Sequence, residues 1–199
     1  GGDGSGKSTQ LALLTDYLNE NGYDCVFTRE PGGTKISEKI REIILDGGNK
    51  EETPETEALL YAAARAQLVS ELIIPAAESG KIVVCDRYID SSVAYQGYGR
   101  GLGKEFIDDI NSFAIKNRMP DVTLFFDITP ERAFERKGGA DKNDRMEQSG
   151  LSFHKKVYEG YLRQATEYPE RIVRINAEQT VEKVFADVIR VLKERNIVK

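Results

Sequence analysis

The chain has 199 residues, of which 40% are apolar and 31% are charged, and its formal net charge is −5. This length and composition are typical of one soluble globular domain with a single core, and the negative charge argues against a broad nucleic-acid-binding surface. No apolar stretch of the ~18 residues that cross a membrane and no secretory signal stand out, so we expect no membrane partner.

Two periodicities of apolar residues alternate along the chain, one near 3.6 and one near 2, which predicts an α/β domain. Thr53, Pro54 and Glu55 mark a helix start, with a hydroxyl cap, a proline in the first turn and an acid near the positive helix end. The predicted helices cover residues 8–21, 36–46, 53–69 and 105–117, a segment beginning at Thr129-Pro130-Glu131, and the stripe from Val181 to Leu192. The predicted strands are residues 24–29, 81–85, 121–128 and 171–175.

The cysteines and the single histidine receive structural interpretations. Cys25 and Cys85 lie inside apolar, strand-like runs and lack the spacing of a metal site, so we expect two buried, reduced thiols. His154 lies in a polar stretch and is expected at the surface.

Residues 1–8, GGDGSGKS, match the phosphate-binding pattern G-x-x-x-x-G-K-[ST] in full, and an amphipathic helix follows at once. Glycines let backbone N–H groups converge on phosphate oxygens, Lys7 reaches the β- and γ-phosphates, and the Ser8 hydroxyl can ligate Mg²⁺. The predicted nucleotide-binding residues are Gly1, Gly2, Asp3, Gly4, Ser5, Gly6, Lys7, Ser8 and Thr9. Because this loop normally follows a strand, we also expect a short strand before Gly1.

Kinases, switch GTPases and motors all use such a loop. The chain has no guanine-reading N-K-x-D motif and is too short for a motor. Four further segments, TREPGGT (28–34), LLYAAARAQ (59–67), DRYIDSSVAYQGYGRG (86–101) and D-R-M-E (144–147), occur in the order found in thymidylate kinases. The chain therefore resembles thymidylate kinases of the bacterial type.

This resemblance implies one domain over residues 1–199 with a three-layer P-loop kinase fold. Its central parallel sheet would have five strands flanked by helices, and a mobile lid would lie at about 135–147. The implied activity is the phosphorylation of dTMP to dTDP by ATP and Mg²⁺ in dTTP biosynthesis. The implied protein is a cytoplasmic homodimer whose partners are dTMP and ATP.

The resemblance also assigns an acceptor site. Glu30, with Arg29, would lie near the dTMP phosphate, which Arg41 would touch. Tyr61 would stack on thymine, where the family usually has Phe, and Arg65 would donate to the thymine O4. Read without the family, residues 28–34 form a simple turn, Tyr61 is a core residue and Arg65 is a surface charge.

The segment after residue 85 carries the remaining acceptor residues. Asp86 and Arg87 end a buried strand, which places them at the carboxyl edge of the sheet, where α/β proteins bind ligands. Arg87 would clamp the phosphates, and Asp86 would hold Mg²⁺-bound water or orient Arg87. By resemblance, Ser92 and Gln96 lie near the base, Tyr95 crowds the sugar C2′, Asp3 faces the acceptor sugar or its phosphate, and Arg100 reaches a phosphate.

Residues 135–145, ERKGGADKNDR, show no periodicity and are a solvated loop by default. The P-loop contains no arginine, and such family members bring one from the lid. We therefore expect Arg136 and Arg145 to contact the donor phosphates, with Lys137 and Lys142 as alternatives.

Two rival interpretations stay open. One is another (deoxy)nucleoside monophosphate kinase on the same scaffold. The other is a non-catalytic nucleotide-binding protein, against which the acceptor set Arg41, Arg87 and Tyr95 argues, since a sensor needs no second nucleotide site.

Overall fold

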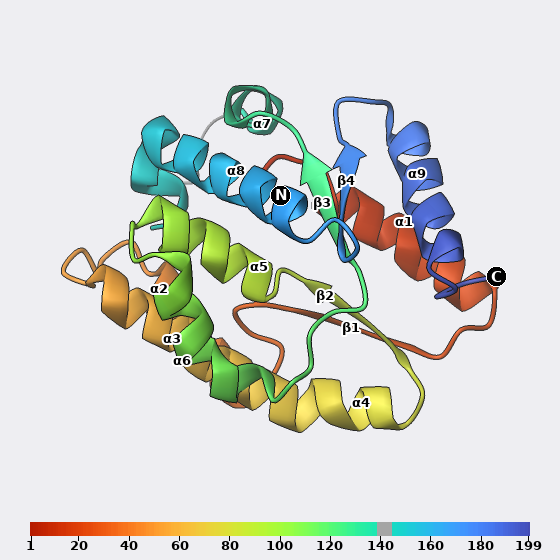
Figure 1. Ribbon diagram of the computed structural model, residues 1–199, viewed down its shortest axis with the longest axis horizontal. Coiled ribbons are helices and arrows are strands. Elements are labelled where there is room, and N and C mark those ends of the chain that lie inside the picture. The colour runs from red at the N-terminus through yellow and green to blue at the C-terminus, as the bar shows by residue number, and fades with distance from the viewer. Residues whose placement is uncertain (139–144) are drawn as a thin grey trace.

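Figure 1 shows the computed structural model, which describes residues 1–138 and 145–199. The middle of the predicted lid, with Lys142 and Asp144, lies outside the described residues.

Four strands lie in the described part of the chain, and they form two parallel pairs. Their bounds agree with the predicted strands to within two residues: β1 (Cys25–Arg29), β2 (Ile82–Asp86), β3 (Thr123–Asp127) and β4 (Ile172–Asn176). β1 pairs with β2, placing Arg29 opposite Asp86, and β3 pairs with β4. Because both pairs are parallel, the two strands of each pair end at the same edge.

The predicted five-stranded sheet is replaced, in the described residues, by these two separate pairs. A cavity of about 680 Å³ lies between β2 and β3, beside Gly1, and its walls are mainly apolar. The cavity separates the two pairs, and the strand expected before Gly1 stays a prediction.

Helices surround the strands: α1 (Lys7–Glu20), α2 (Lys35–Leu45), α3 (Pro54–Leu68), α4 (Ile74–Glu78), α5 (Ile89–Ser92), α6 (Lys104–Ile115), α7 (Pro130–Lys137), α8 (Gly150–Glu167) and α9 (Val181–Glu194). The predicted helices correspond to α1, α2, α3, α6, α7 and α9 and are confirmed with shifts of one to two residues at most ends, whereas α4, α5 and α8 were not predicted. Short π-helical turns η1 (Val69–Ile73) and η2 (Val93–Gly99) extend α3 and α5, and a 3₁₀ turn η3 (Glu147–Ser149) precedes α8. Thr53 caps α3 as predicted, its hydroxyl accepting from the Thr56 N–H at 3.3 Å.

Two adjacent phenylalanines of β3, Phe125 and Phe126, pack into the cores on opposite faces of the strand. Side chains alternate between the faces of a strand, so Phe126 packs into the core formed with α1 and α9, while Phe125 joins the core under α8 and η2. Figure 1 shows α8 on one side of β3 and β4 and α1 with α9 on the other. The layered α/β arrangement is therefore confirmed.

One continuous helix, Pro54–Glu78, is long and apolar enough to cross a membrane by length and composition, with a mean hydropathy of 1.2 over its best window. The sequence reading missed it. The helix packs against α2 and α6 and buries the charged side chains of Glu57 and Arg65 in ion pairs. Core helices of globular domains pass the same test, so the helix is weak evidence for a span.

Two expectations about single residues are wrong. His154 is buried, with 7% of its surface exposed, because α7 covers the start of α8 and the ring packs edge-on against Phe134 and Phe153. Cys25 and Cys85 are free thiols, but both are only partly buried. Cys85 lines the cavity between the strand pairs, and Cys25 begins the outer strand of its pair.

The buried histidine predicts an acid-sensitive stability. Burial lowers the pKa of His154 below its ordinary value of 6.5, and Arg87 adds to this, although Asp3 and Glu147 oppose it. Below pH 6.5, His154 is protonated in the unfolded chain but stays neutral in the folded one. The free energy of unfolding therefore falls as the pH drops, by at most about 1.4 kcal/mol per pH unit. His154 is the single histidine of the chain.

Chemical denaturation at pH 7.5 and 5.5 checks this expectation. The wild-type protein should lose stability relative to the His154→Phe variant over this interval. Parallel pH dependences of the two proteins would show that His154 titrates normally.

Candidate active site

The phosphate-binding loop depends on glycine at a tight contact. Gly4 adopts a left-handed φ of +80°, and a Cβ atom there would lie 2.3 Å from the Ala133 carbonyl oxygen. Gly6, at φ +89°, leads into the first turn of α1. Gly6, Ser8 and Thr9 are exposed, so the positive end of this helix is open to an anionic ligand. The loop therefore has the predicted form of a phosphate cradle.

Three charged side chains meet beside this loop. The Arg87 guanidinium donates to an Asp3 carboxylate oxygen at 2.6 Å, and Lys7 Nζ lies 3.8 Å from the same carboxylate. Lys7 also donates to the carbonyl oxygen of Gly2 at 2.8 Å. Burial and then Arg87 lower the pKa of Lys7 to about 8. Burial raises the pKa of Asp3, but Arg87 and Lys7 outweigh it and hold that pKa below its ordinary value.

Arg87 joins this charged group to a neighbouring cavity. It directly follows β2 in a left-handed conformation, with φ of +68°, and its guanidinium lies 5.0 Å from the centre of the Tyr95 ring. One terminal nitrogen of Arg87 and the hydroxyl of Tyr95 are buried without a hydrogen-bond partner among the described residues. Buried polar atoms are normally paired, so these two indicate a polar ligand at this position.

The neighbouring cavity measures about 100 Å³, and it brings together nine of the residues predicted for the acceptor site. These residues come from the P-loop, the positions directly after β1 and β2, and α2, α3, α5 and η2: Asp3, Glu30, Arg41, Tyr61, Arg65, Arg87, Ser92, Tyr95 and Gln96. Met146 contributes a further wall. Arg29 does not line this cavity; its exposed side chain pairs with Glu38 at 2.9 Å.

A buried network holds Arg65 in the wall of this cavity. Its side chain is 1% exposed and donates from Nε to Glu30 at 2.9 Å, with further bonds to Ser92 at 3.0 Å and to Asn111. Burial raises the pKa of Glu30, and Arg65 opposes that shift. Of the five N–H groups of a guanidinium, these contacts leave one on NH1 for a ligand. The interpretation of Arg65 as a surface charge is therefore wrong.

Arg136 and Arg145 of the predicted lid have partners outside the P-loop. The Arg136 guanidinium donates to the Ala177 carbonyl at 2.6 Å, and Arg145 pairs with Glu52 at 2.9 Å and with Glu57 at 2.7 Å. Arg100 also pairs with Glu57, at 3.0 Å. The structure therefore gathers Arg145 and Arg100 beside the acceptor cavity.

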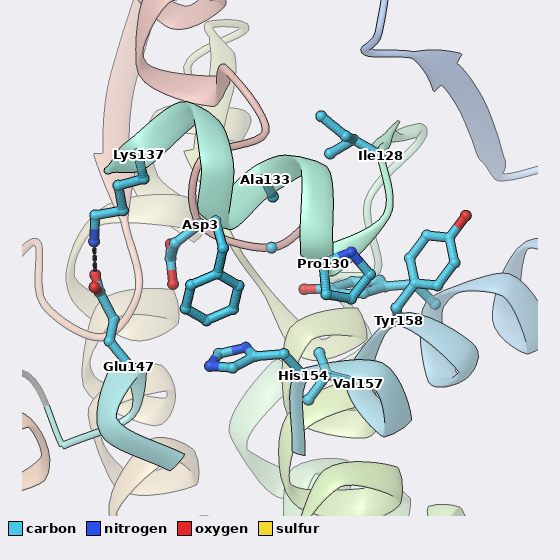
Figure 2. Close-up of a pocket in the computed structure, with 12 residues that line it drawn as sticks. Asp3, Ile128, Pro130, Ala133, Lys137, Glu147, His154, Val157 and Tyr158 are labelled. Atoms are coloured by element: carbon cyan, nitrogen blue, oxygen red, sulfur yellow. Dashed lines mark hydrogen bonds and ion pairs between the residues drawn. The ribbon is translucent and has the colours of Figure 1, made fainter. Parts of the chain in front are cut away.

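A smaller cavity of about 30 Å³ lies between the P-loop, α7 and α8 (Figure 2). Lys137 and Glu147 form an ion pair across its mouth, and Asp3 and His154 face its interior. Sequence reasoning missed His154, Glu57 and Asn111, since nothing local in the sequence signals that these polar residues are buried.

The two residues predicted to hold a metal are compatible with Mg²⁺. Ser8 is exposed at the start of α1, and Asp86 ends β2, close enough to Lys7 to oppose the lowering of the Lys7 pKa. Residues 1–138 and 145–199 contain no group of three His, Cys, Asp or Glu side chains that could hold a metal alone. Mg²⁺ usually keeps waters and takes only one or two protein ligands beside substrate phosphates, so the available donors fit it.

The family model described as thymidylate kinase matches residues 1–188. The chain belongs to the thymidylate kinase family. A thymidylate kinase of Finegoldia magna is 52% identical over 197 residues, covering 99% of this chain and 97% of that relative. Another, from Halalkalibacterium halodurans, is 50% identical over 197 residues, covering 98% of this chain and 94% of the relative.

A solved structure supports the same family at the level of the fold. The crystal structure of thymidylate kinase from Ehrlichia chaffeensis superposes with a TM-score of 0.78 at 33% sequence identity, covering 96% of this chain and 93% of that chain. The predicted resemblance and the P-loop kinase fold are confirmed by these matches.

Proposed function

We propose that this member of the thymidylate kinase family transfers the γ-phosphate of ATP to dTMP, yielding dTDP for dTTP synthesis. One observation carries the proposal: the nine predicted acceptor residues line one cavity that shares Asp3 with the phosphate-binding loop. A protein that only senses ATP would not need this second site. We further propose that the enzyme works in the cytoplasm, where its nucleotide substrates are found.

In the proposed reaction, the protein positions the phosphates of ATP and dTMP and stabilises the negative charge on the phosphoryl group during transfer. An oxygen of the dTMP phosphate attacks the γ-phosphorus of ATP, and the bond to the bridging oxygen of ADP breaks. The attacking oxygen is already anionic, so no general base is needed. Lys7 would hold the donor phosphates, while the unpartnered N–H of Arg87 would donate to the group in transit.

Mg²⁺ is the proposed metal, held near Ser8 and Asp86. It would neutralise charge on the β- and γ-phosphates. Ser8 would bind the ion through its exposed hydroxyl at the start of the helix. Asp86 would accept hydrogen bonds from water bound to the ion.

A coupled assay of ADP release with and without dTMP tests the function. We expect ADP release that depends on dTMP and is weaker with dUMP and much weaker with dCMP or dGMP. ADP release that ignores dTMP, or that prefers dCMP or dGMP, would overturn the proposal.

We propose that Arg136 contacts the donor phosphates during transfer. It lies on α7, whose Ala133 carbonyl lies close to Gly4 of the P-loop, and its hydrogen bond among the described residues goes to a backbone carbonyl. We expect Arg136→Ala to lower kcat by about 10²-fold with little change in the KM for dTMP, since one charge-stabilising donor is lost. Steady-state kinetics check this, with Arg132→Ala, an exposed arginine of α7 paired to Glu135, as the control.

We also propose a homodimer through the layer of α2, α3 and α6. α3 packs between the other two helices, and each of the three carries large exposed apolar side chains: Ile36 and Ile43, Leu59, and Phe113, which is 88% exposed. Ile36 and Ile43 are seven residues apart and share one helix face. Apolar groups gathered on one side of a domain mark an interface.

The Phe113→Glu variant tests this assembly. A buried, unpaired charge at an interface costs several kcal/mol, so sedimentation velocity should show a dimer for the wild type and a monomer for the variant. Val181→Glu changes an exposed apolar residue on α9, away from this layer, and should leave the dimer intact. A wild-type monomer would end the proposal.

A further inference from the structure

Glu57 is a fully buried carboxylate that neither the P-loop nor the predicted acceptor set includes. Its side chain is 0% exposed and lies in the first turns of α3. It accepts a hydrogen bond from Gln96 Nε2 at 2.7 Å, and it pairs with Arg100 at 3.0 Å and with Arg145 at 2.7 Å. Three elements distant in sequence therefore meet at one carboxylate.

Among the residues that the structure describes, the charges around Glu57 balance. Arg145 pairs with Glu52 at 2.9 Å as well, so two guanidinium groups face two carboxylates. Met146, the next residue, contacts Arg100 through its sulfur and lines the acceptor cavity. Buried ion pairs often add little stability over apolar packing, so a role other than stability is a reasonable explanation for this cluster.

The carboxylate fixes the orientation of the Gln96 amide. An amide has one end that donates and one that accepts, and the two ends look alike in shape. A carboxylate accepts only, so the nitrogen of Gln96 must face Glu57. The carbonyl oxygen of Gln96 then has no hydrogen-bond donor among the described residues, and Gln96 lines the acceptor cavity with Arg65 and Ser92.

We propose that Glu57 is a specificity-determining positioning residue, which turns the Gln96 carbonyl oxygen toward the acceptor base so that the cavity requires an N–H donor there. Thymine and uracil carry such a donor at N3. Cytosine has an acceptor at N3, so its lone pair would face the carbonyl oxygen of Gln96 and both would stay unpaired. Leaving buried polar groups unpaired is the strongest way for a site to reject an analogue.

Arg100 and Arg145 act through Glu57 in this arrangement. They hold the Glu57 carboxylate in place through ion pairs. If an amide replaced this carboxylate, both arginines would donate to the amide oxygen. In the Glu57→Gln variant, the new N–H₂ group would then face Gln96, whose amide would turn over and present its own N–H₂ to the base. The preference between thymine and cytosine should weaken or reverse.

The experiment compares Glu57→Gln with Glu52→Gln. Both variants remove one negative charge beside Arg145, but Glu52 has no contact with Gln96. We expect Glu57→Gln to lower the ratio of kcat/KM for dTMP over dCMP at least tenfold, with the KM for ATP within twofold of wild type. Glu52→Gln should keep the ratio within twofold. An unchanged ratio in Glu57→Gln, or equal falls in both variants, would overturn the inference.

A second measurement covers a Glu57→Gln variant that fails to fold. In ¹⁵N spectra of the wild type, the Gln96 side-chain amide, assigned by its loss in Gln96→Met, should be shifted by its carboxylate partner and protected from exchange with and without dTMP. An amide that exchanges freely, or that changes partner when dTMP binds, would overturn the inference.

The inference rests on the proposed acceptor, and the two can fail separately. Wild-type protein without dTMP-dependent ADP release would overturn both. Wild-type activity on dTMP with no effect of Glu57→Gln on the ratio would overturn the inference alone.

Discussion

Replacing Arg87 by alanine is expected to lower kcat by about 10³-fold, because an arginine that stabilises a phosphoryl group in transit contributes at least that much. Arg87 is the residue that contacts Asp3 of the P-loop, lies over the Tyr95 ring and keeps a buried N–H without a partner in the described chain. The variant should still bind ATP, because Lys7 and the P-loop amides are unchanged.

Single-turnover and steady-state ADP release measure this effect. Arg29→Ala is the matched control, since Arg29 ends the neighbouring strand β1, is exposed and pairs only with Glu38 among described side chains. Its activity should stay within a few-fold of wild type. An Arg87→Ala enzyme with more than a tenth of wild-type kcat would remove Arg87 from the transfer step.

Replacing Glu30 by alanine is expected to destabilise the fold by about 3–5 kcal/mol, because it leaves the buried Arg65 charge without its partner. Arg65 is 1% exposed, and its guanidinium pairs with the Glu30 carboxylate, which is buried as well. For a domain of this size such a loss lowers the Tm by roughly 10 °C.

Calorimetry or denaturant unfolding measures the loss. The exposed pair of Arg190 and Glu194 on α9 offers a control, since Glu194→Ala should change stability by less than about 1 kcal/mol. A Glu30→Ala protein as stable as the wild type would mean that Arg65 finds water or another partner.

The sequence predicted well whatever depends on neighbours along the chain. The cap at Thr53, the four strands and the stripe of α9 all follow from short-range patterns, and the structure agrees. Helix α8 was missed although Phe153, Val157 and Tyr161 repeat every four residues along it. The apolar spacing of these three residues is visible in the sequence, but the polar residues between them obscure the helical pattern.

The residues of the candidate site that lie within the family motifs could be predicted from the sequence. The nine acceptor residues come from motifs that stand far apart in sequence, and the structure gathers them in one cavity. Glu57, Asn111 and His154 escaped because their burial is decided by η2, α3 and α7, respectively, and not by adjacent residues. Arg145 was expected at the donor phosphates because of its place in the chain, and its contact with them stays a prediction; the structure pairs it with Glu52 and Glu57.

The pairing of the strands was less predictable from the sequence than the strands themselves. Five strands were expected, and the described chain contains four in two pairs. Each strand was found from its own apolar run, but pairing depends on what lies between β2 and β3, which no local pattern records.

The acceptor cavity draws its wall from segments that begin at Asp3 and end at Met146. No single hairpin, helix pair or terminal half of the chain contains enough of that wall to hold a nucleotide. An opening that removes any of these segments would therefore weaken binding of the acceptor, and bound nucleotide would in turn suppress every opening that breaks the cavity. Resistance to proteolysis should therefore rise as the concentration of free acceptor increases.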